Sequence, residues 1–324
     1  GLGDVYKRQV KGELLLQDKK ITNKTHSQLD FVNIPIDKDV KLFLDPTKLH
    51  SKNLSPIFKE ASQKLHSFFL EAYRLYTEFG ENEVRDIFQF SSECNFIHLG
   101  YSKSKSRGTG VSEKMLFDFF QKLTSFNTAE RNILLHPASL AIFVPKFAED
   151  RTSDFLVSLL KKEIVEHSLE QAKINQLEIE QSEYDFDHYW DCASLSWKKI
   201  KHFYIKVNSK PLLLIPKCLV SQKYKFSTSH FVKTIIFPNK RNLKKYQGIN
   251  GYDKDNRPRP ATQEQLIAHE IHSPYLNCPD KWKTYAMNQL LQNHNWYNEY
   301  FQNMNNFADN HIIPDDELDR LTNN

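Results

Sequence analysis

Two kinds of hydrophobic spacing occur in different parts of this chain, and together they limit the fold class. Between residues 55 and 79, apolar residues recur at steps of three and four, which is typical of an amphipathic helix. Similar spacing predicts helices over residues 83–90, 113–123, 152–173, 262–271 and 280–307, with Ser112 as the N-cap of the helix at 113–123. Residues 133–144 form a buried apolar run that ends at Pro145.

Spacing of two, which is typical of half-buried strands, occurs in residues 10–46 and again after residue 200. There, residues 201–207 and 211–220 are expected to form a β-hairpin about the turn at 208–210, and residues 231–237 a third strand. An acidic connection at 178–191 precedes them. The chain is therefore predicted to be α+β, with a mixed sheet, flanking helices and a C-terminal helical segment.

The composition supports a folded chain, since 40% of the 324 residues are hydrophobic and 13% are aromatic. We expect residues 1–9 to be an appended sequence outside the fold. Residues 10–260 are expected to form an α+β core domain with a basic β region at 192–252. Residues 261–313 are expected to form a C-terminal helical extension, and residues 314–324 a polar tail.

The apolar runs and the cysteines indicate where such a protein works. No apolar run approaches the ~18 residues that a membrane helix needs, so no membrane partner is expected. The four cysteines, Cys94, Cys192, Cys218 and Cys278, contain no CxxC pair, which argues against a disulfide framework and a zinc knuckle. These features favour a cytoplasmic protein with free thiols.

The charges are distributed unevenly along the chain. The 61 residues from 192 to 252 contain thirteen Lys or Arg and no Asp or Glu, so this segment carries about +13. The rest of the chain holds 31 of the 44 basic residues against 40 acidic ones, and therefore carries about −9. Because like charges repel, so basic a segment favours a polyanionic partner that supplies the opposite charge.

Aromatic residues lie between these basic residues, as a surface that stacks nucleic-acid bases would require. The residues predicted to bind nucleic acid, DNA or RNA, are Lys198, Lys199, Lys201, Lys206, Lys223, Lys225, Lys240, Arg241, Lys244 and Lys245. The alternative is that the basic sheet faces the acidic helix at 163–170 and is neutralised within the fold.

A glycine-rich loop at 100–110 leads into the helix predicted from residue 113. Glycines allow close backbone approach, and a helix N-terminus attracts anions. A phosphate-binding loop is therefore one interpretation, with Lys103, Lys105, Arg107, Gly108, Gly110 and Ser112 as its residues. The sequence matches neither a Walker A motif nor GxGxxG, so a plain connecting loop is the other interpretation.

Carboxylates on and near the helix at 152–173 could support phosphodiester hydrolysis. Two or three carboxylates can hold Mg²⁺, and Asp150, Asp154 and Glu163 are the predicted ligands. Lys217 ends an apolar run and is the predicted phosphate-facing lysine. Asp154, Glu163 and Lys217 are thus the candidate catalytic residues. The alternatives are helix capping for the carboxylates and a structural ion pair for Lys217.

At these residues the chain resembles a group of uncharacterised bacterial proteins encoded near phage-defence genes. The resemblance rests on residues 33–46, 99–110, 150–154 and 213–217. The order of carboxylates followed by a strand ending in lysine is also loosely similar to the PD-(D/E)XK nuclease superfamily. In that pattern an acid stands two residues before the lysine, whereas this chain has Ile215 there.

These observations predict a nucleic-acid-binding protein. If the protein is also an enzyme, the predicted activity is that of a metal-dependent nuclease in bacterial antiviral defence. Mg²⁺ would then be the cofactor. One alternative is a non-catalytic binder of nucleic acid or nucleotides. Another is an interaction protein whose basic sheet docks on an acidic partner, such as a protein encoded by a neighbouring gene.

Overall fold

A computed structural model describes residues 20–36, 38–52, 54–88, 96–100, 109–207, 210–307 and 312–323, with no side chains for 109–112. Its α-helices are α2 (Ala61–Phe79), α3 (Glu81–Phe88), α4 (Thr109–Leu123), α5 (Thr128–Leu134), α6 (Ala138–Phe143), α7 (Glu149–Leu159), α8 (Lys161–Asn175), α9 (Thr228–Phe231), α10 (Phe237–Arg241), α11 (Gln263–Leu266), α12 (Lys281–Gln292), α13 (Trp296–Phe307) and α14 (Asp315–Asn323). Short 3₁₀ helices are η1 (His26–Gln28), η2 (Pro46–His50), η3 (Pro56–Phe58), η4 (Lys217–Leu219) and η6 (Lys244–Tyr246), whereas η5 (Val232–Ile236) and η7 (Ile267–His272) are π-helical turns.

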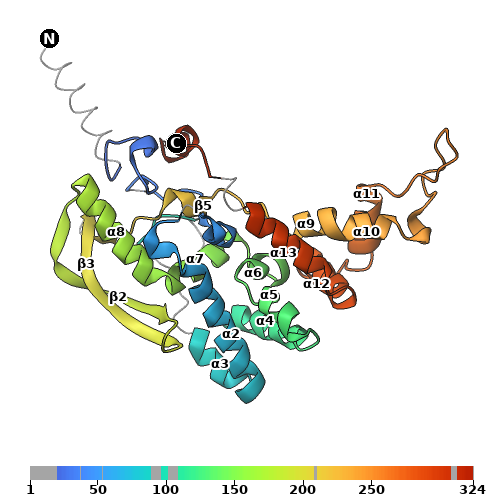
Figure 1. Cartoon of the computed structure of the whole chain (residues 1–324), viewed down its shortest axis with the longest axis horizontal. Helices are drawn as coiled ribbons and strands as arrows, with labels where there is room; N and C mark the ends of the chain where they lie inside the picture. Colours follow the sequence, from blue (N-terminus) through green and yellow to red (C-terminus); the bar gives the residue numbers. More distant parts are fainter. Residues whose placement is uncertain are drawn as a thin grey trace, which may run out of the picture.

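Two small antiparallel sheets complete the fold. The larger has the order β2 (Ile179–Asp191), β3 (Ser196–Val207) and β4 (Lys210–Leu212), and the smaller pairs β1 (Phe43–Leu44) with β5 (Val220–Ser221). Helix α8 packs against β2 and β3, at the left of Figure 1. The predicted α+β class is confirmed.

One hydrophobic core joins these elements, and α2 is at its centre. The ring of Phe68 on α2 lies 4.9 Å from that of Trp190 on β2 and 5.4 Å from that of Phe155 on α7. These rings meet edge to face, the arrangement that aromatic side chains prefer. Because all three side chains are buried, this cluster fixes the sheet and α7 to α2. No helix among the described residues is long and apolar enough to cross a membrane.

Several predicted elements differ from those in the structure. Residues 231–237 form α9, η5 and α10 rather than a strand, because the buried residues Val232, Ile235 and Ile236 follow helical spacing. A run of seven residues is too short to separate the two patterns. Of the predicted strand at 211–220, only Pro211 and Leu212 join the larger sheet, within β4, while Val220 at its end pairs with β1 as part of β5.

Other differences concern the ends and breaks of elements. The acidic connection at 178–191 is the long strand β2, whose alternating residues Phe186 and Trp190 are fully buried. The helix predicted at 152–173 is two helices, because the backbone leaves helical geometry at Leu160. The predicted polar tail forms α14, which is anchored by hydrogen bonds from His26 to Asp319 and from Lys20 to Thr322. The appended sequence expected at 1–9 lies outside the described residues.

Candidate nucleic-acid interface

The basic residues of β3 lie beside acidic residues of β2. The carboxylate of Glu180 lies 2.6 Å from the Lys206 ammonium, and that of Asp191 lies 2.6 Å from the Lys198 ammonium. Lys201 lies 3.9 Å from Asp185. The neutralising carboxylates thus come from the neighbouring strand rather than from the acidic helix at 163–170.

The ion pairs at the two ends of the β2–β3 hairpin lower the pKa values of their carboxyl groups. Hydrogen bonds from Lys198 and Ser194 lower the pKa of Asp191 to about 2. A hydrogen bond from Lys206 lowers the pKa of Glu180 in the same way. Exposed pairs of this kind contribute little to stability, but they leave the hairpin with little net charge. Lys199, also on β3, is exposed.

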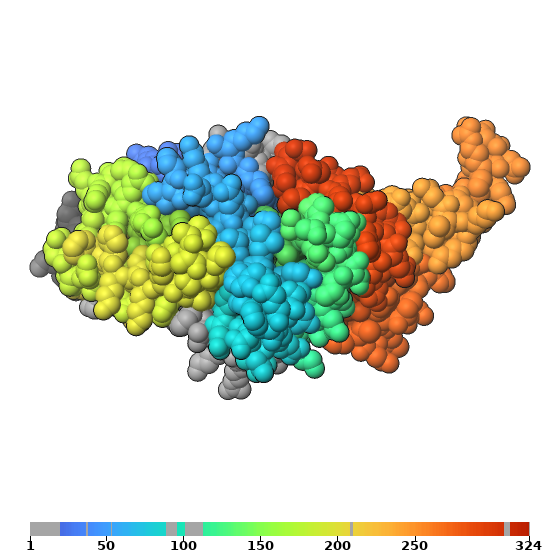
Figure 2. Space-filling view, turned by 60° about the horizontal axis from the view of Figure 1, so that its bottom comes forward, coloured from blue at the N-terminus to red at the C-terminus, as the bar shows by residue number. Residues whose placement is uncertain are grey.

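A second group of basic residues lies on a part of the chain that projects from the body. Residues 240–260, here called the basic arm, contain seven Lys or Arg and two Asp. The arm begins with the last two residues of α10 and ends before α11, at the right of Figure 1, and Figure 2 shows it extending beyond the rest of the surface. The basic residues of the arm are Lys240, Arg241, Lys244, Lys245, Lys254, Arg257 and Arg259.

The tip of the arm is an ordered turn. Tyr252 and Pro258 form an isolated β-bridge, and the Arg259 amide donates to the Gly251 carbonyl at 2.8 Å. Gly251 has a φ of +75°, which favours glycine at this position. The carboxylate of Asp253 accepts from the backbone N–H of Arg257 at 2.8 Å and so closes the turn. Tyr252 is left 61% exposed on this turn.

The base of the arm is fixed by one carboxylate. Glu270 on η7 lies 2.9 Å from the Lys245 ammonium and 3.4 Å from that of Lys240. It also accepts hydrogen bonds from the hydroxyls of Tyr246 and Tyr285. Burial alone would raise the pKa of Glu270, but these donors and cations outweigh burial and lower the pKa to about 2. Two of the predicted lysines therefore hold the arm in place.

Three basic residues of the arm were missed in the sequence analysis, namely Lys254, Arg257 and Arg259. They lie after Asp253, where the segment without acidic residues ends. The relevant signal was a sequence pattern in which Gly248 and Gly251 are followed by Pro258 and Pro260. This pattern indicates a turn that exposes the basic residues within it. Lys223 and Lys225, by contrast, lie before α9, and Lys225 stands over the ring of Phe307 at 3.1 Å.

The residues predicted to hold Mg²⁺ have separate surroundings. Asp150 and Asp154 lie on α7, and the electrostatic effect of their carboxylates, like that of Asp45 and Glu149, reaches the buried Tyr224. Burial raises the pKa of Tyr224, and the four carboxylates raise it further. Asp150 also packs against Gly100, since a β-carbon on that glycine would lie 2.6 Å from Asp150 Oδ1.

Glu163 lies on α8 and forms an ion pair with Lys64 of α2, with Nζ–O distances of 2.7 and 2.8 Å. Both partners are largely buried, so this carboxylate balances a buried ammonium. Across the described ranges, no three His, Cys, Asp or Glu side chains are grouped so that they could hold a metal ion. Glu163 is thus engaged by Lys64, and Mg²⁺ binding by Asp150, Asp154 and Glu163 stays a prediction.

Lys217 has a structural partner. Its ammonium donates to Asp315 Oδ1 of α14 at 2.7 Å and to the carbonyl of His26 at 2.6 Å. The ion-pair interpretation thus describes its contacts, although the partner is α14 rather than the acidic helix.

The predicted phosphate loop lies largely outside the described residues, which include neither Lys103 and Lys105 nor Arg107 and Gly108. Gly110 and Ser112 lie within α4. Because α4 begins at Thr109, Ser112 is not its N-cap. The phosphate-binding loop stays a prediction.

Comparison with known proteins gives one result that bears on this geometry. A family model described as a domain of unknown function, DUF8370, matches residues 20–227. The chain belongs to the DUF8370 family. No curated protein and no solved structure matches it. The DUF8370 match includes both sheets and α2 to α8, whereas the basic arm lies after its last residue.

The Lys217 contact, which joins the DUF8370 region to α14, can be tested by substitution. We expect Lys217→Met to keep the apolar stem but to release α14, at a cost of about 1 kcal/mol, since the pair is partly exposed. Limited proteolysis should then cut near α14 faster than in the wild type, with nucleic-acid binding unchanged. Lys24→Met, which removes an exposed hydrogen bond to Asn175, is the control. Equal cleavage of both variants would contradict this role.

Proposed function

We propose that this protein binds nucleic acid through the basic arm. The observation that carries the proposal is a projecting, ordered turn with basic residues in excess and an exposed tyrosine at its tip. Cations on a projecting surface can follow a phosphate backbone, and their binding releases condensed counterions. The ring of Tyr252 can stack on an unpaired base, an interaction that tolerates any sequence.

The arm is favoured over the β2–β3 hairpin as the site of binding. Hairpin lysines such as Lys198 and Lys206 have carboxylate partners that a polyanion would have to displace. At the arm, Glu270 engages Lys240 and Lys245 at the base, and Arg257 lies 3.9 Å from Asp255 at the tip. Seven basic residues against these carboxylates and Asp253 still leave the arm with a net positive charge, unlike the hairpin. The proposal concerns binding, because the predicted metal ligands contact other groups. A docking site for an acidic protein would use the same surface and is an outcome of the test below.

Binding to labelled oligonucleotides at several salt concentrations tests this function. We expect the logarithm of the association constant to fall linearly with the logarithm of salt between about 50 and 200 mM, with a slope of about 0.7 to 0.9 per phosphate contact. Single- and double-stranded DNA and RNA should be compared, and stacking by Tyr252 favours the single strands. No binding at about 50 mM salt, or a flat response, would reject the proposal and leave an acidic protein partner as the better account.

A further inference from the structure

Two histidines from distant parts of the chain meet on the surface against which α13 packs. His50 is the last residue of η2, and His136 lies in the turn between α5 and α6. Their Nε2 atoms are 2.9 Å apart, and the centroids of their rings are 4.8 Å apart. The ring of Phe301 on α13 stands edge-on to both, with its centroid 6.1 Å from that of His50 and 5.1 Å from that of His136. The histidine pair, His50 and His136, therefore forms part of the packing surface of α13.

The hydrogen bonds of the histidine pair fix the positions of its protons. A backbone N–H can only donate, so the Ala138 amide at 3.2 Å makes His136 Nδ1 an acceptor. A neutral imidazole carries one N–H, which for His136 must then be at Nε2, where it donates to His50 Nε2. The atoms that could take up a further proton, His50 Nε2 and His136 Nδ1, are thus both in use as acceptors. This arrangement requires both rings to be neutral.

The surroundings of the pair also disfavour a positive charge. Burial lowers the pKa of both histidines, and His50 and His66 lower the pKa of His136 further. His66 comes from α2, and its Nε2 is buried without a hydrogen-bond partner. These three histidines are not grouped so that they could hold a metal ion. The histidines that pair with carboxylates in the described ranges are others, namely His26, His98, His188 and His294.

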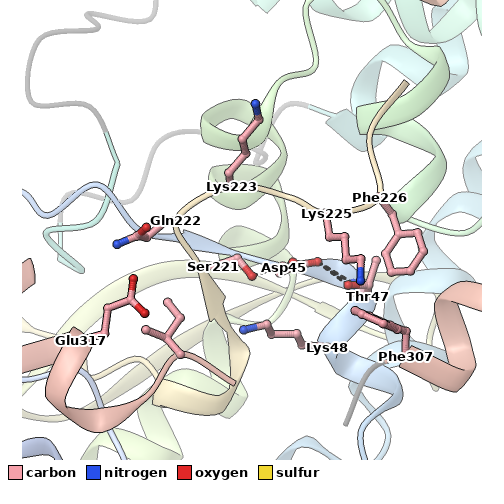
Figure 3. Close-up of a pocket in the computed structure, with 11 residues that line it drawn as sticks. Asp45, Thr47, Lys48, Ser221, Gln222, Lys223, Lys225, Phe226, Phe307 and Glu317 are labelled. Carbon is pink, nitrogen blue, oxygen red and sulfur yellow. Dashed lines mark hydrogen bonds between the residues drawn. The ribbon is translucent and has the colours of Figure 1, made fainter. Parts of the chain in front are cut away.

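The 3₁₀ helix η2 holds its end of the pair in place. It begins after Asp45, whose Oδ1 accepts from the amide and hydroxyl of Thr47 at 3.0 and 2.7 Å. Asp45 Oδ2 accepts from the hydroxyl of Ser221 on β5, and Lys48 donates to the carbonyl of Val220 on the same strand. Figure 3 shows the Asp45 carboxylate between Thr47 and Ser221, with the side chain of Lys48 below them. Because η2 is tied to β5 in this way, the ring at its last residue has little freedom to move away from its partner.

The other polar contacts of α13 respond to acid in different ways. The hydroxyl of Tyr297 bonds to α6 at 2.9 Å, and no charge is involved. Just before the helix, His294 lies 3.1 Å from Glu130, and protonation of His294 strengthens that pair. His230 of α9 bonds to the hydroxyl of Tyr300 at 2.9 Å, and burial lowers the pKa of His230. Acid therefore acts against the packing of α13 at His230 and at the histidine pair, and in its favour at His294.

We propose that the histidine pair is a pH-sensitive contact, which holds α13 on the DUF8370 region at neutral pH and weakens this packing in acid. A proton on His50 Nε2 would face the N–H of His136, and a proton on His136 Nδ1 would face the amide of Ala138. Either protonation turns a hydrogen bond into a contact between two donors, which is relieved when water reaches the rings. Phe301 packs on both rings, so α13 is the element that has to move. This contact does not depend on nucleic-acid binding by the basic arm.

The pH range of the effect follows from the two states of α13. When α13 is open, the histidines titrate near their ordinary value of about 6.5, whereas the packed state requires them to be neutral. Because the pKa of each is lowered in the packed state, the packing is fully stable above about pH 6.5 and weakens as the pH falls below it. Each proton taken up on opening changes the equilibrium by about 10-fold per pH unit.

Hydrogen–deuterium exchange of the full chain at pH 7 and pH 5, with labelling times scaled for the intrinsic exchange rate, measures this opening. We expect the protection of α13 to fall by at least about 10-fold at pH 5, while that of α2 is unchanged. His50→Gln keeps an acceptor oxygen for His136 but cannot be protonated, so the loss of protection should become about 3- to 10-fold smaller. His272→Gln, which replaces an exposed histidine of η7, is the control and should behave like the wild type.

A second variant is available if His50→Gln does not fold. Phe301→Ala opens both rings to water, so α13 should already exchange faster at pH 7 and respond less to acid than in the wild type. Equal protection of α13 at both pH values in the wild type would overturn the proposal. An acid response of the same size in His50→Gln or in Phe301→Ala, or a parallel loss of protection in α2, would also overturn it, because the histidine pair would then not control α13.

Discussion

Replacing Lys254, Arg257 and Arg259 together by serine is expected to weaken nucleic-acid binding about 10- to 100-fold at low salt, or about 1.4 to 2.8 kcal/mol. These residues lie on the exposed tip of the arm, so the core of the protein is left intact. If each cation contacts one phosphate, the slope of the salt dependence should also fall by about 2 to 3. Fluorescence anisotropy with a labelled oligonucleotide measures both quantities.

The matched control removes the same charge from the larger sheet. Lys198, Lys201 and Lys206 on β3 are replaced by serine, which also takes three positive charges from the chain. Because carboxylates of β2 lie beside these lysines, we expect this variant to lose less than about 3-fold in affinity. An equal loss of affinity in both variants would mean that binding depends on net charge alone. A larger loss in the control would mean that the hairpin is the binding site.

The spacing of apolar residues predicted those elements whose buried positions repeat regularly along the element itself. The helix at α2 was found because its buried positions, from Ala61 through Leu65 and Phe68 to Ala72, repeat over several turns. Strand β2 was missed although Phe186 and Trp190 alternate with polar residues, because its many acidic residues resembled a solvated connection. The charge of a segment therefore hid its periodicity.

The candidate site depended on partners that are distant in the chain. Lys217 pairs with Asp315, 98 residues away, and Glu163 pairs with Lys64, 99 residues away. No local pattern links such residues, so their sequence neighbours suggested a metal site instead. The charge of the segment at 192–252 was read correctly, but its division into a neutralised hairpin and a projecting arm follows from the pairing of β2 with β3.

Glu270→Gln is expected to destabilise the protein by about 2 to 3 kcal/mol at neutral pH, because it removes the charge that pairs with Lys240 and Lys245 and replaces one of the two acceptor oxygens by an NH2 donor. The Glu270 side chain is only 10% exposed, so water compensates this loss poorly. Weakening the contacts of Glu270 with Lys240, Lys245 and Tyr246 should also loosen the arm and reduce nucleic-acid affinity in the same variant. Urea unfolding at constant temperature gives the free energy of unfolding.

The free energy of unfolding should differ between the wild type and Glu270→Gln in a pH-dependent way, and this dependence identifies the Glu270 carboxylate as the cause. The pKa of this carboxyl group is about 2 in the folded protein, against 4.5 as its ordinary value. A lowered pKa means that the stabilisation is complete above the unfolded value and is lost as the pH falls from 4.5 towards 2. The difference in free energy of unfolding between the wild type and Glu270→Gln should therefore be constant above a pH of about 5 and become smaller below it. Glu299→Gln, an exposed carboxylate of α13, is the control and should show a small gap at every pH. If Glu270→Gln loses no more stability than this control, or if its gap does not narrow in acid, then Glu270 does not anchor the arm.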